Sequence, residues 1–511
     1  MNRSRQRRRE QNQFKIEKRR AERKLRQRQA AEGLKAFPTA TIANGKSEWT
    51  SVDEERQARQ QAVEEQLRVY RSVLPKVLTR FEQIPDPRNP KSIRHKSTVL
   101  LLYGILVFVF QMMSRREANR EMTLPQFQEN LKLLFPELDS MPHQDTLNRL
   151  LARIPVDQIQ DALIELIQDL MRNKKFCRYL VAKRYSIMMD GTQKMARYLF
   201  WSEACLQREL KSKDKDGTAT VRTQYYVYVL EANLVFPNGL TIPLMSEFLS
   251  STEVDPASSK QDCETKAFHR LAAKIKEKFP RLPILILLDG LYPNGPVLKR
   301  CRDYGWQFMI VLQDDSLPSV WQEFRGLQKI EKQNIFPYKW GDRRQQFRWV
   351  NNIHYHWGDK ERKRQSVHVV TCEEQWEEID PDTAKPVLRT SRHAWISSEP
   401  LNRDNVHERC NLIARHRWGI ESNFLVEKHQ GYQYEHRFSE NWTAMKGYHF
   451  LMRLGHLINA LSQWTTYLAQ FVRRRGVRGL IQFIRETCKG PWLDADRIRQ
   501  LHASPIQLRL T

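Results

Sequence analysis

Cysteine is scarce and scattered in this chain, and no apolar run is long enough to cross a membrane. The seven cysteines form no Cys-x-x-Cys pair and their number is odd, which argues against a disulfide framework. The strongest apolar run, 99–113, is about five residues short of the roughly 20 that span a bilayer, so we expect a buried helix there. The charged N-terminus has no apolar stretch behind it, which predicts no signal peptide. These features favour a reduced, cytoplasmic protein.

Negative charge is the second shortage. The chain contains 59 Asp and Glu residues but 85 Lys and Arg residues, which leaves a net charge of +26. So large an excess of one sign repels itself unless a polyanion binds. Nucleic acid is the partner that fits best, with an anionic membrane surface as the alternative.

Much of the positive charge lies in an N-terminal arm. Residues 1–36 contain 14 Lys and Arg residues but only 4 Asp and Glu residues. We expect residues 1–51, which comprise this arm and a linker, to be disordered alone, and the arm to become helical once phosphates neutralise it. Attachment to phosphates without base specificity is the interpretation that we favour, and a solvated tail is the alternative.

Helical periodicity dominates residues 52–175. Apolar residues recur at helical spacing in four stretches, at about 52–80, 97–113, 124–134 and 144–173. Three prolines between residues 84 and 90 end the first stretch. Residues 52–175 are therefore predicted to form an all-α N-terminal domain with a DNA-binding or accessory role.

The pattern changes to alternating strands and helices at residue 183. Five runs rich in β-branched and aromatic residues are predicted strands: 186–189, 225–235, 241–246, 284–288 and 307–312. A hairpin turn is expected at 236–240 and a helix at 263–279. This order predicts an α/β fold for 183–313 of the ribonuclease H-like kind, a mixed sheet with helices on both faces. The ends of the first and fourth strands would lie side by side in it.

Six tryptophans and several strand-like runs mark residues 314–400 as a small β-rich insertion. Helical spacing resumes after it, so 401–472 are predicted to complete the α/β core. Residues 473–511 form a basic C-terminal tail.

Three acidic residues stand where they could hold metal ions. Two apolar runs end in Asp-Gly, at Asp190 and Asp289, and a predicted helix carries Glu421. Two Mg²⁺ ions held by carboxylates meet the needs of phosphodiester cleavage, with Asp190 bridging both ions and Asp289 and Glu421 each holding one. Each feature alone is common in turns and on helix surfaces. Their order along the chain predicts a metal-dependent phosphoryl-transfer site.

Two cations flank the glutamate. On a regular helix Arg417 and Lys428 share a face with Glu421, since they stand one turn before it and two turns after it. Such cations suit phosphates beside the scissile bond, and Arg can bind them bidentately. An ordinary solvated ion-pair face is the alternative.

These residues carry a resemblance to a known family. Arg417, Glu421 and Lys428 are spaced as in the second half of the Tyr-x2-Arg-x3-Glu-x6-Lys signature of DDE transposases of the insertion-sequence-four-like family. Asp190 and Asp289 look like the first and second acids of that family, and residues 81–96 are similar to the N-terminal domain that often accompanies it. The signature tyrosine is the one departure, because its position holds an alanine, residue 414.

The resemblance implies an enzyme that cuts double-stranded DNA at transposon ends and joins the 3′-OH to target DNA. It implies two Mg²⁺ ions, for which Mn²⁺ can substitute, and a homodimer on the DNA. It implies a prokaryotic, nucleoid-associated protein of the cytoplasm. A catalytically silent DNA-binding relative, which the missing tyrosine would suit, and a hydrolytic nuclease of the same fold are the alternatives.

The family also has a β insertion between the second acid and the glutamate, in which a tryptophan can stack on a flipped base. Trp340, Trp349 and Trp357 are the candidates here. Core packing of the insertion is the alternative for each of them. Three histidines, His354, His356 and His368, could suggest zinc, but we favour surface or core histidines because no cysteine lies at ligand spacing.

Overall fold

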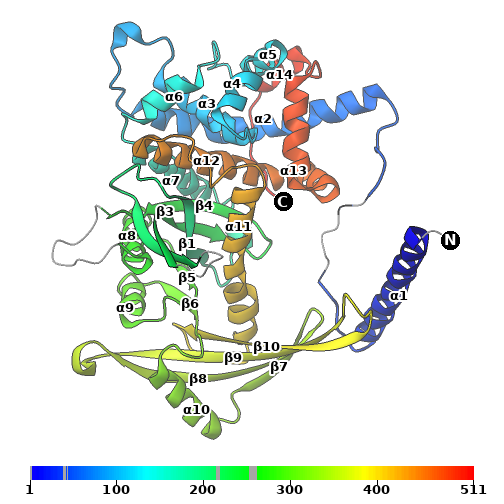
Figure 1. The fold of residues 1–511 in the computed structure, drawn as a ribbon, viewed down its shortest axis with the longest axis vertical. Coiled ribbons are helices and arrows are strands. Elements are labelled where there is room, and N and C mark those ends of the chain that lie inside the picture. Colours follow the sequence, from blue (N-terminus) through cyan, green and yellow to red (C-terminus); the bar gives the residue numbers. More distant parts are fainter. Residues whose placement is uncertain (1–2, 38–41, 43, 214–218, 252–261) are drawn as a thin grey trace. The chain divides into compact units, whose positions relative to one another are not determined.

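The computed structural model describes residues 3–37, 42, 44–213, 219–251 and 262–511. The chain divides into two compact units, and Figure 1 labels their helices and strands. The first unit comprises Met1–Ala40 and Ile284–Arg417, and the second comprises Thr41–Pro283 and Trp418–Thr511.

The first unit is built on six strands that follow one another in a single path. β5 pairs in parallel with β6, and β10, β9, β8 and β7 follow in antiparallel order. The predicted β insertion therefore continues the sheet of β5 and β6 through the pairing of β10 with β6. The elements are α1 (Arg3–Ala31), β5 (Ile284–Leu288), α9 (Gly295–Asp303), β6 (Gln307–Val311), α10 (Pro318–Ile330), β7 (Ile335–Trp340), β8 (Arg343–Trp357), β9 (Lys363–Ile379), β10 (Pro386–Ser397), the π-helical turn η5 (Glu408–Ile413) and the 3-10 turn η6 (Ala414–Arg417).

The second unit combines helices with four antiparallel strands. β3 pairs with β1, β2 and β4. The strands are β1 (Tyr185–Arg197), β2 (Leu206–Lys213), β3 (Ala219–Val235) and β4 (Thr241–Phe248). The helices are α2 (Val52–Glu82), α3 (Ser97–Val109), α4 (Arg115–Met122), α5 (Pro125–Leu134), α6 (Gln144–Leu151), α7 (Asp157–Arg172), α8 (Glu264–Lys278), α11 (Trp418–His429), α12 (Trp442–Gln463), α13 (Thr466–Lys489) and α14 (Ala495–Ala503).

The apolar run at 99–113 is a buried helix, as its length predicts. Residues 100–109 of α3 are all buried, and α3 packs against α12. The two helices approach so closely that a Cβ on Gly455 would lie 2.8 Å from the Cβ of Phe108. Among the described residues, none of the helices has both the length and the apolar character that a bilayer crossing needs.

Several predicted elements need correction. The predicted helix 144–173 is two helices, α6 and α7, because Pro155 lies between them and cannot continue a helix. Four further elements, α4, β2, β7 and α10, were not predicted from the sequence. The C-terminal tail is also more regular than expected, since α13 extends to Lys489 and α14 follows it.

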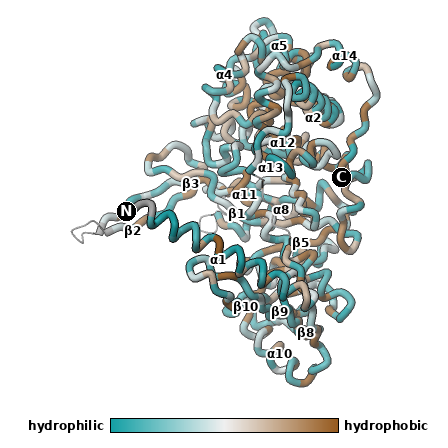
Figure 2. The backbone as a smooth tube through the Cα atoms, turned by 90° about the vertical axis from the view of Figure 1, so that its right-hand side faces the viewer, coloured by the Kyte–Doolittle hydropathy of each residue, from teal (hydrophilic) through white to brown (hydrophobic). Residues whose placement is uncertain are grey.

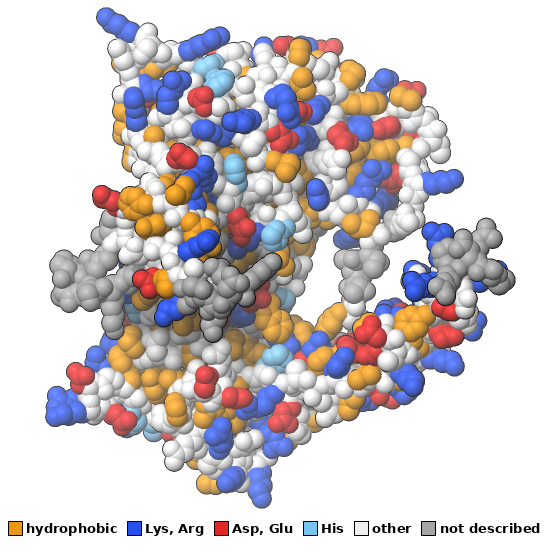
Figure 3. All heavy atoms as spheres, viewed as in Figure 1, with side chains coloured by type: hydrophobic (Ala, Val, Ile, Leu, Met, Phe, Trp, Pro, Cys, Tyr) orange, Lys and Arg blue, Asp and Glu red, His pale blue; other side chains and the backbone are white. Residues whose placement is uncertain are grey.

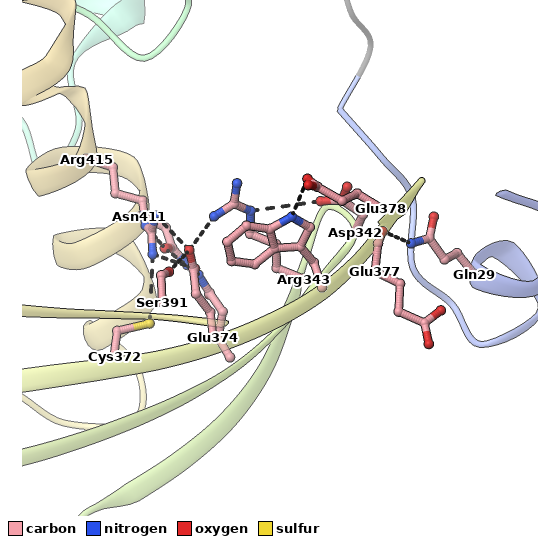
Figure 4. Close-up of polar contacts among 12 residues, drawn as sticks. Gln29, Asp342, Arg343, Cys372, Glu374, Glu377, Glu378, Ser391, Asn411 and Arg415 are labelled. Atoms are coloured by element: carbon pink, nitrogen blue, oxygen red, sulfur yellow. Dashed lines mark hydrogen bonds and ion pairs between the residues drawn. The ribbon is translucent and has the colours of Figure 1, made fainter. Parts of the chain in front are cut away.

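The basic N-terminal arm forms a helix where we expected disorder. α1 is hydrophilic along nearly all of its length (Figure 2), and only its C-terminal part packs on the rest of its unit. Leu25 of α1 and Leu34 just after the helix are buried, and Arg28 forms an ion pair with Glu377 of β9. The amide of Gln29 also donates to the Glu377 carbonyl oxygen at 3.2 Å (Figure 4). In this structure the helical arm therefore contacts a residue of its own chain, Glu377, whereas we expected the helix to form on phosphates.

Candidate active site

Asp190 lies within a strand, not at its end as we expected. β1 continues to Arg197, and Asp190 stands opposite Glu231 of β3 in the register. The Asp190 side chain is half-buried, and its Oδ1 accepts the Gly191 backbone N–H at 2.9 Å. A Cβ on Gly191 would lie 2.4 Å from both Tyr228 and Glu264, so the glycine makes room for these side chains.

Glu421 belongs to the same unit and lies in the first turn of α11. The start of this helix lies directly on the strands of β1 and β3, since a Cβ on Gly419 would be 3.1 Å from Met188 Cε and 3.6 Å from Val235 Cγ1. Met188 precedes Asp190 by two residues on β1. This packing places the turn that carries Glu421 against the strand that carries Asp190, and Glu421 itself is exposed.

Asp289 lies in the first unit, directly after β5. The five residues of β5 are fully buried, and Asp289 is half-exposed where the strand ends. Its Oδ1 accepts the Leu291 backbone N–H at 2.9 Å, which fixes the turn after the strand. A Cβ on Gly290 would meet the Gln313 side chain at 2.4 Å, so this position also needs glycine for packing.

The two cations beside Glu421 do not share one regular helix. Residues 408–417 run through the π turn η5 and the 3-10 turn η6, and α11 begins only at Trp418. Arg417 therefore precedes the α-helix, and the argument for a shared face holds only for Glu421 and Lys428. Lys428 is largely buried and forms an ion pair with Glu435 at 3.1 Å.

A buried ion-pair network holds the segment that leads to Arg417. Arg415 donates to Glu374 of β9 at 2.6 Å, and the Glu374 side chain is fully buried (Figure 4). Burial alone would raise the pKa of Glu374, but hydrogen bonds from His393 and Gln345 and the charge of Arg415 outweigh it and lower that pKa. The carboxylate is therefore ionised, and it fixes η6 on the insertion.

The three candidate tryptophans have different surroundings. Trp349 is only 4% exposed, so it belongs to the core of the insertion and has no free face for a base. Trp340 is partly exposed, with the ring of Phe37 at 4.8 Å and the Arg415 guanidinium at 5.0 Å. Trp357 is also partly exposed and packs closely on Gly295. Trp340 and Trp357 thus remain candidates for base stacking.

A second buried ionic network lies in the second unit, on the face of β3 that carries Glu231. Arg453 of α12 pairs with Glu427 of α11 at 2.9 Å and with Glu231 of β3 at 3.3 Å. All three side chains are fully buried. The network ties α11 to β3 and so supports the helix that carries Glu421. We did not foresee it, although an arginine inside the apolar run of α12 was a signal that a buried partner exists.

Oxygen ligands suit Mg²⁺, and the predicted acids supply carboxylates that are exposed or half-exposed. Within the described part of the chain, no group of three or more His, Cys, Asp or Glu side chains is gathered closely enough to hold a metal ion. The assignment of Asp190, Asp289 and Glu421 as ligands stays a prediction.

Comparison with protein-family models gives two matches. Residues 247–455 match a family described as "Transposase DDE domain". The chain contains a transposase DDE domain. Residues 78–167 match a second family, described as "DDE_Tnp_1-associated". The two matches together support a DDE transposase, a DNA-processing enzyme of a class that generally uses divalent metal ions.

All the candidate site residues except Asp190 lie inside the DDE match. Asp289, Glu421 and the three tryptophans lie inside it, and so do both cations beside Glu421. Asp190 lies before the matched residues. No curated protein matches the chain.

Proposed function

We propose that this DDE transposase cuts double-stranded DNA at transposon ends and joins the 3′-OH ends to target DNA. One observation carries the proposal: the matched DDE domain contains Asp289 at the end of a buried strand and Glu421 in the first turn of a helix, with both carboxylates reaching solvent. The spacing of Arg417, Glu421 and Lys428 supports the insertion-sequence-four-like family and its ribonuclease H-like fold as the finer assignment.

Each candidate residue has a role in this proposal. Asp190, Asp289 and Glu421 would hold two Mg²⁺ ions, or Mn²⁺ in their place. Bound there, divalent cations would activate the attacking oxygen and stabilise the leaving oxygen. Arg417 and Lys428 would hold phosphates next to the scissile bond. A homodimer on the DNA, in the cytoplasm and at the nucleoid, completes the proposal, because two transposon ends must be cut together.

The test is cleavage and strand transfer on DNA that carries the flanking ends of the element. Asp190→Asn, Asp289→Asn and Glu421→Gln should each abolish joined products with Mg²⁺. Glu440→Gln is the matched control, because Glu440 is an exposed acid that pairs with a neighbouring arginine on the surface. Normal joining by any of the three acid variants would refute the role of that residue.

A catalytically silent DNA-binding relative is the second candidate. The position of the signature tyrosine holds Ala414, which is 3% exposed, so no side chain there reaches DNA. This function predicts that the wild-type chain binds the transposon ends but breaks no strand with either Mg²⁺ or Mn²⁺.

A further inference from the structure

A cavity of about 620 Å³ opens on the second unit, and none of the three predicted acids lines it. It lies between the loop before α3 and one side of α6, within the residues of the DDE_Tnp_1-associated match. Ten residues line it: Arg88, Asn89, Ser92, Arg94, His95, Met141, His143, Thr146, Arg149 and Arg153. Lys and Arg side chains lie over much of the helical part of this unit in Figure 3.

The lining contains four arginines and no acidic residue. In the part of the chain that the structure describes, no ion pair joins Arg94, Arg149 or Arg153 to a carboxylate, and all three are exposed. Like charges gathered around one cavity repel each other unless an anion lies between them. The cavity is therefore built for a negatively charged ligand.

The fourth arginine is fixed in place. Arg88 donates to both carboxylate oxygens of Asp86, at 2.8 and 2.6 Å, and to the His95 carbonyl oxygen at 2.9 Å. These bonds hold the loop that forms one wall of the cavity. Burial, together with the charges of Arg94 and Arg88, lowers the pKa of His95, against the opposing charge of Asp139. The histidine is neutral near pH 7, so arginines supply the charge.

The other wall is one side of α6. Leu147, Leu150 and Leu151 are buried on its inner side. Thr146 and Arg149 lie three residues apart on the cavity side of α6, and Arg153 lies in the turn just after the helix. Arg149 and Arg153 therefore come from the helix and from the turn that follows it, so they can contact two different phosphates.

We propose that this cavity binds the phosphate backbone of duplex DNA and that it gives the DDE_Tnp_1-associated residues their role in the transposase. The proposal rests on the proposed function, which supplies duplex DNA as the substrate. Exposed, unpaired guanidinium groups that line a wide opening suit a backbone lying across it better than a small anion enclosed in it. Contacts of this kind position the DNA and carry no base specificity.

The test compares duplex binding by two double variants in EDTA, where no cleavage takes place. Arg149→Gln with Arg153→Gln removes two charges from the cavity. Arg68→Gln with Arg172→Gln removes two exposed arginines from the same unit that pair with neighbouring acids outside the cavity. The cavity variant should bind a random-sequence duplex about tenfold more weakly, and its slope of log affinity against log salt should fall by about 1.8, whereas the control should stay near wild type.

Two further measurements distinguish a lost DNA contact from a folding defect and from the binding of a small anion. Arg149→Lys with Arg153→Lys keeps both charges and should retain most of the salt slope, which separates a lost contact from a folding defect. Inorganic phosphate at matched ionic strength should not displace the duplex. Equal binding by the cavity and control variants would overturn the proposal, and so would displacement of the duplex by submillimolar phosphate. Failure of the wild-type chain to bind any duplex would instead count against the proposed function itself.

Discussion

The guanidinium of Arg453 donates to the carboxylate of Glu427 at 2.9 Å, with both side chains fully excluded from solvent. Arg453 also donates to Asn233 Oδ1 at 2.5 Å, and His456 lies 2.6 Å from the same Glu427 carboxylate. The pair thereby ties α11, α12 and β3 together. Glu427 stands six residues after Glu421 on α11, so one helix carries both a supporting acid and a candidate catalytic acid.

Glu427→Gln should lower the stability of the protein, whereas Glu421→Gln should abolish strand transfer and leave the stability nearly unchanged. Glu427→Gln leaves the charge of Arg453 incompletely compensated inside the protein, and we expect it to lower the free energy of unfolding by about 3 kcal/mol. Glu421 is exposed, so Glu421→Gln should change that free energy by less than about 0.5 kcal/mol while it abolishes strand transfer. Urea unfolding and the joining assay measure the two effects. A stable, inactive Glu427→Gln variant would contradict this division of roles.

Acid should weaken the second unit through His449. This histidine is fully buried, and burial lowers its pKa from 6.5 to about 4, despite the nearby charge of Glu231. In the unfolded chain His449 is protonated below about pH 6.5, whereas in the folded chain it stays neutral until about pH 4. Stability should therefore fall as the pH drops through this window, by up to about 1.4 kcal/mol per pH unit.

The groups facing His449 allow a control for this pH dependence. Glu231 Oε1 lies 3.2 Å from its Nε2, and Lys194 Nζ lies 3.4 Å from its Nδ1. The pKa of Glu231 is lowered to about 2, so its contribution is lost only at lower pH, between about 4.5 and 2. His449→Gln should flatten the stability profile between pH 6.5 and 4, as measured by urea unfolding at each pH. An unchanged profile would show that other groups cause the acid sensitivity.

The candidate tryptophans should separate into two classes. Trp349→Ala removes a buried side chain and should lower the free energy of unfolding by about 3–5 kcal/mol. Trp340→Ala and Trp357→Ala should weaken the binding of transposon ends, by about 1–3 kcal/mol for a residue that stacks on a base. Fluorescence of a base analogue at the cleavage point reports the stacking. If neither variant changes that signal, base stacking by Trp340 and by Trp357 is excluded.

The attachment of α1 should depend on buried leucines more than on ion pairs. Arg28 pairs with Glu377 and Arg344 pairs with Glu32, but exposed pairs contribute only about 0–1 kcal/mol each. Glu377→Gln should therefore loosen α1 slightly, whereas Leu34→Ser should loosen it strongly, because Leu34 is 2% exposed. Amide hydrogen exchange over residues 20–31 measures this, and equal protection in both variants would contradict the ranking.

Elements whose pattern is local could be predicted from the amino-acid sequence. The apolar runs of β5 and α3, the turn at 236–240 and the helix of α8 could be predicted because spacing, turn residues and burial act within a few neighbours. The spacing around Glu421 and the two Asp-Gly pairs pointed to a transposase, and the DDE match supports that class.

Features that depend on residues distant in the chain could not be predicted from the sequence. Arg453 pairs with Glu231, 222 positions away, and Arg415 pairs with Glu374, 41 positions away. No local sequence pattern encodes either pairing. The four arginines of the cavity come together because the buried leucines of α6 turn its other side towards the loop before α3. The packing of α1 on β9 likewise joins residues more than 340 positions apart. Burial and charge pairing between distant segments decide these features, since the energy of such contacts exists only once the chain has folded.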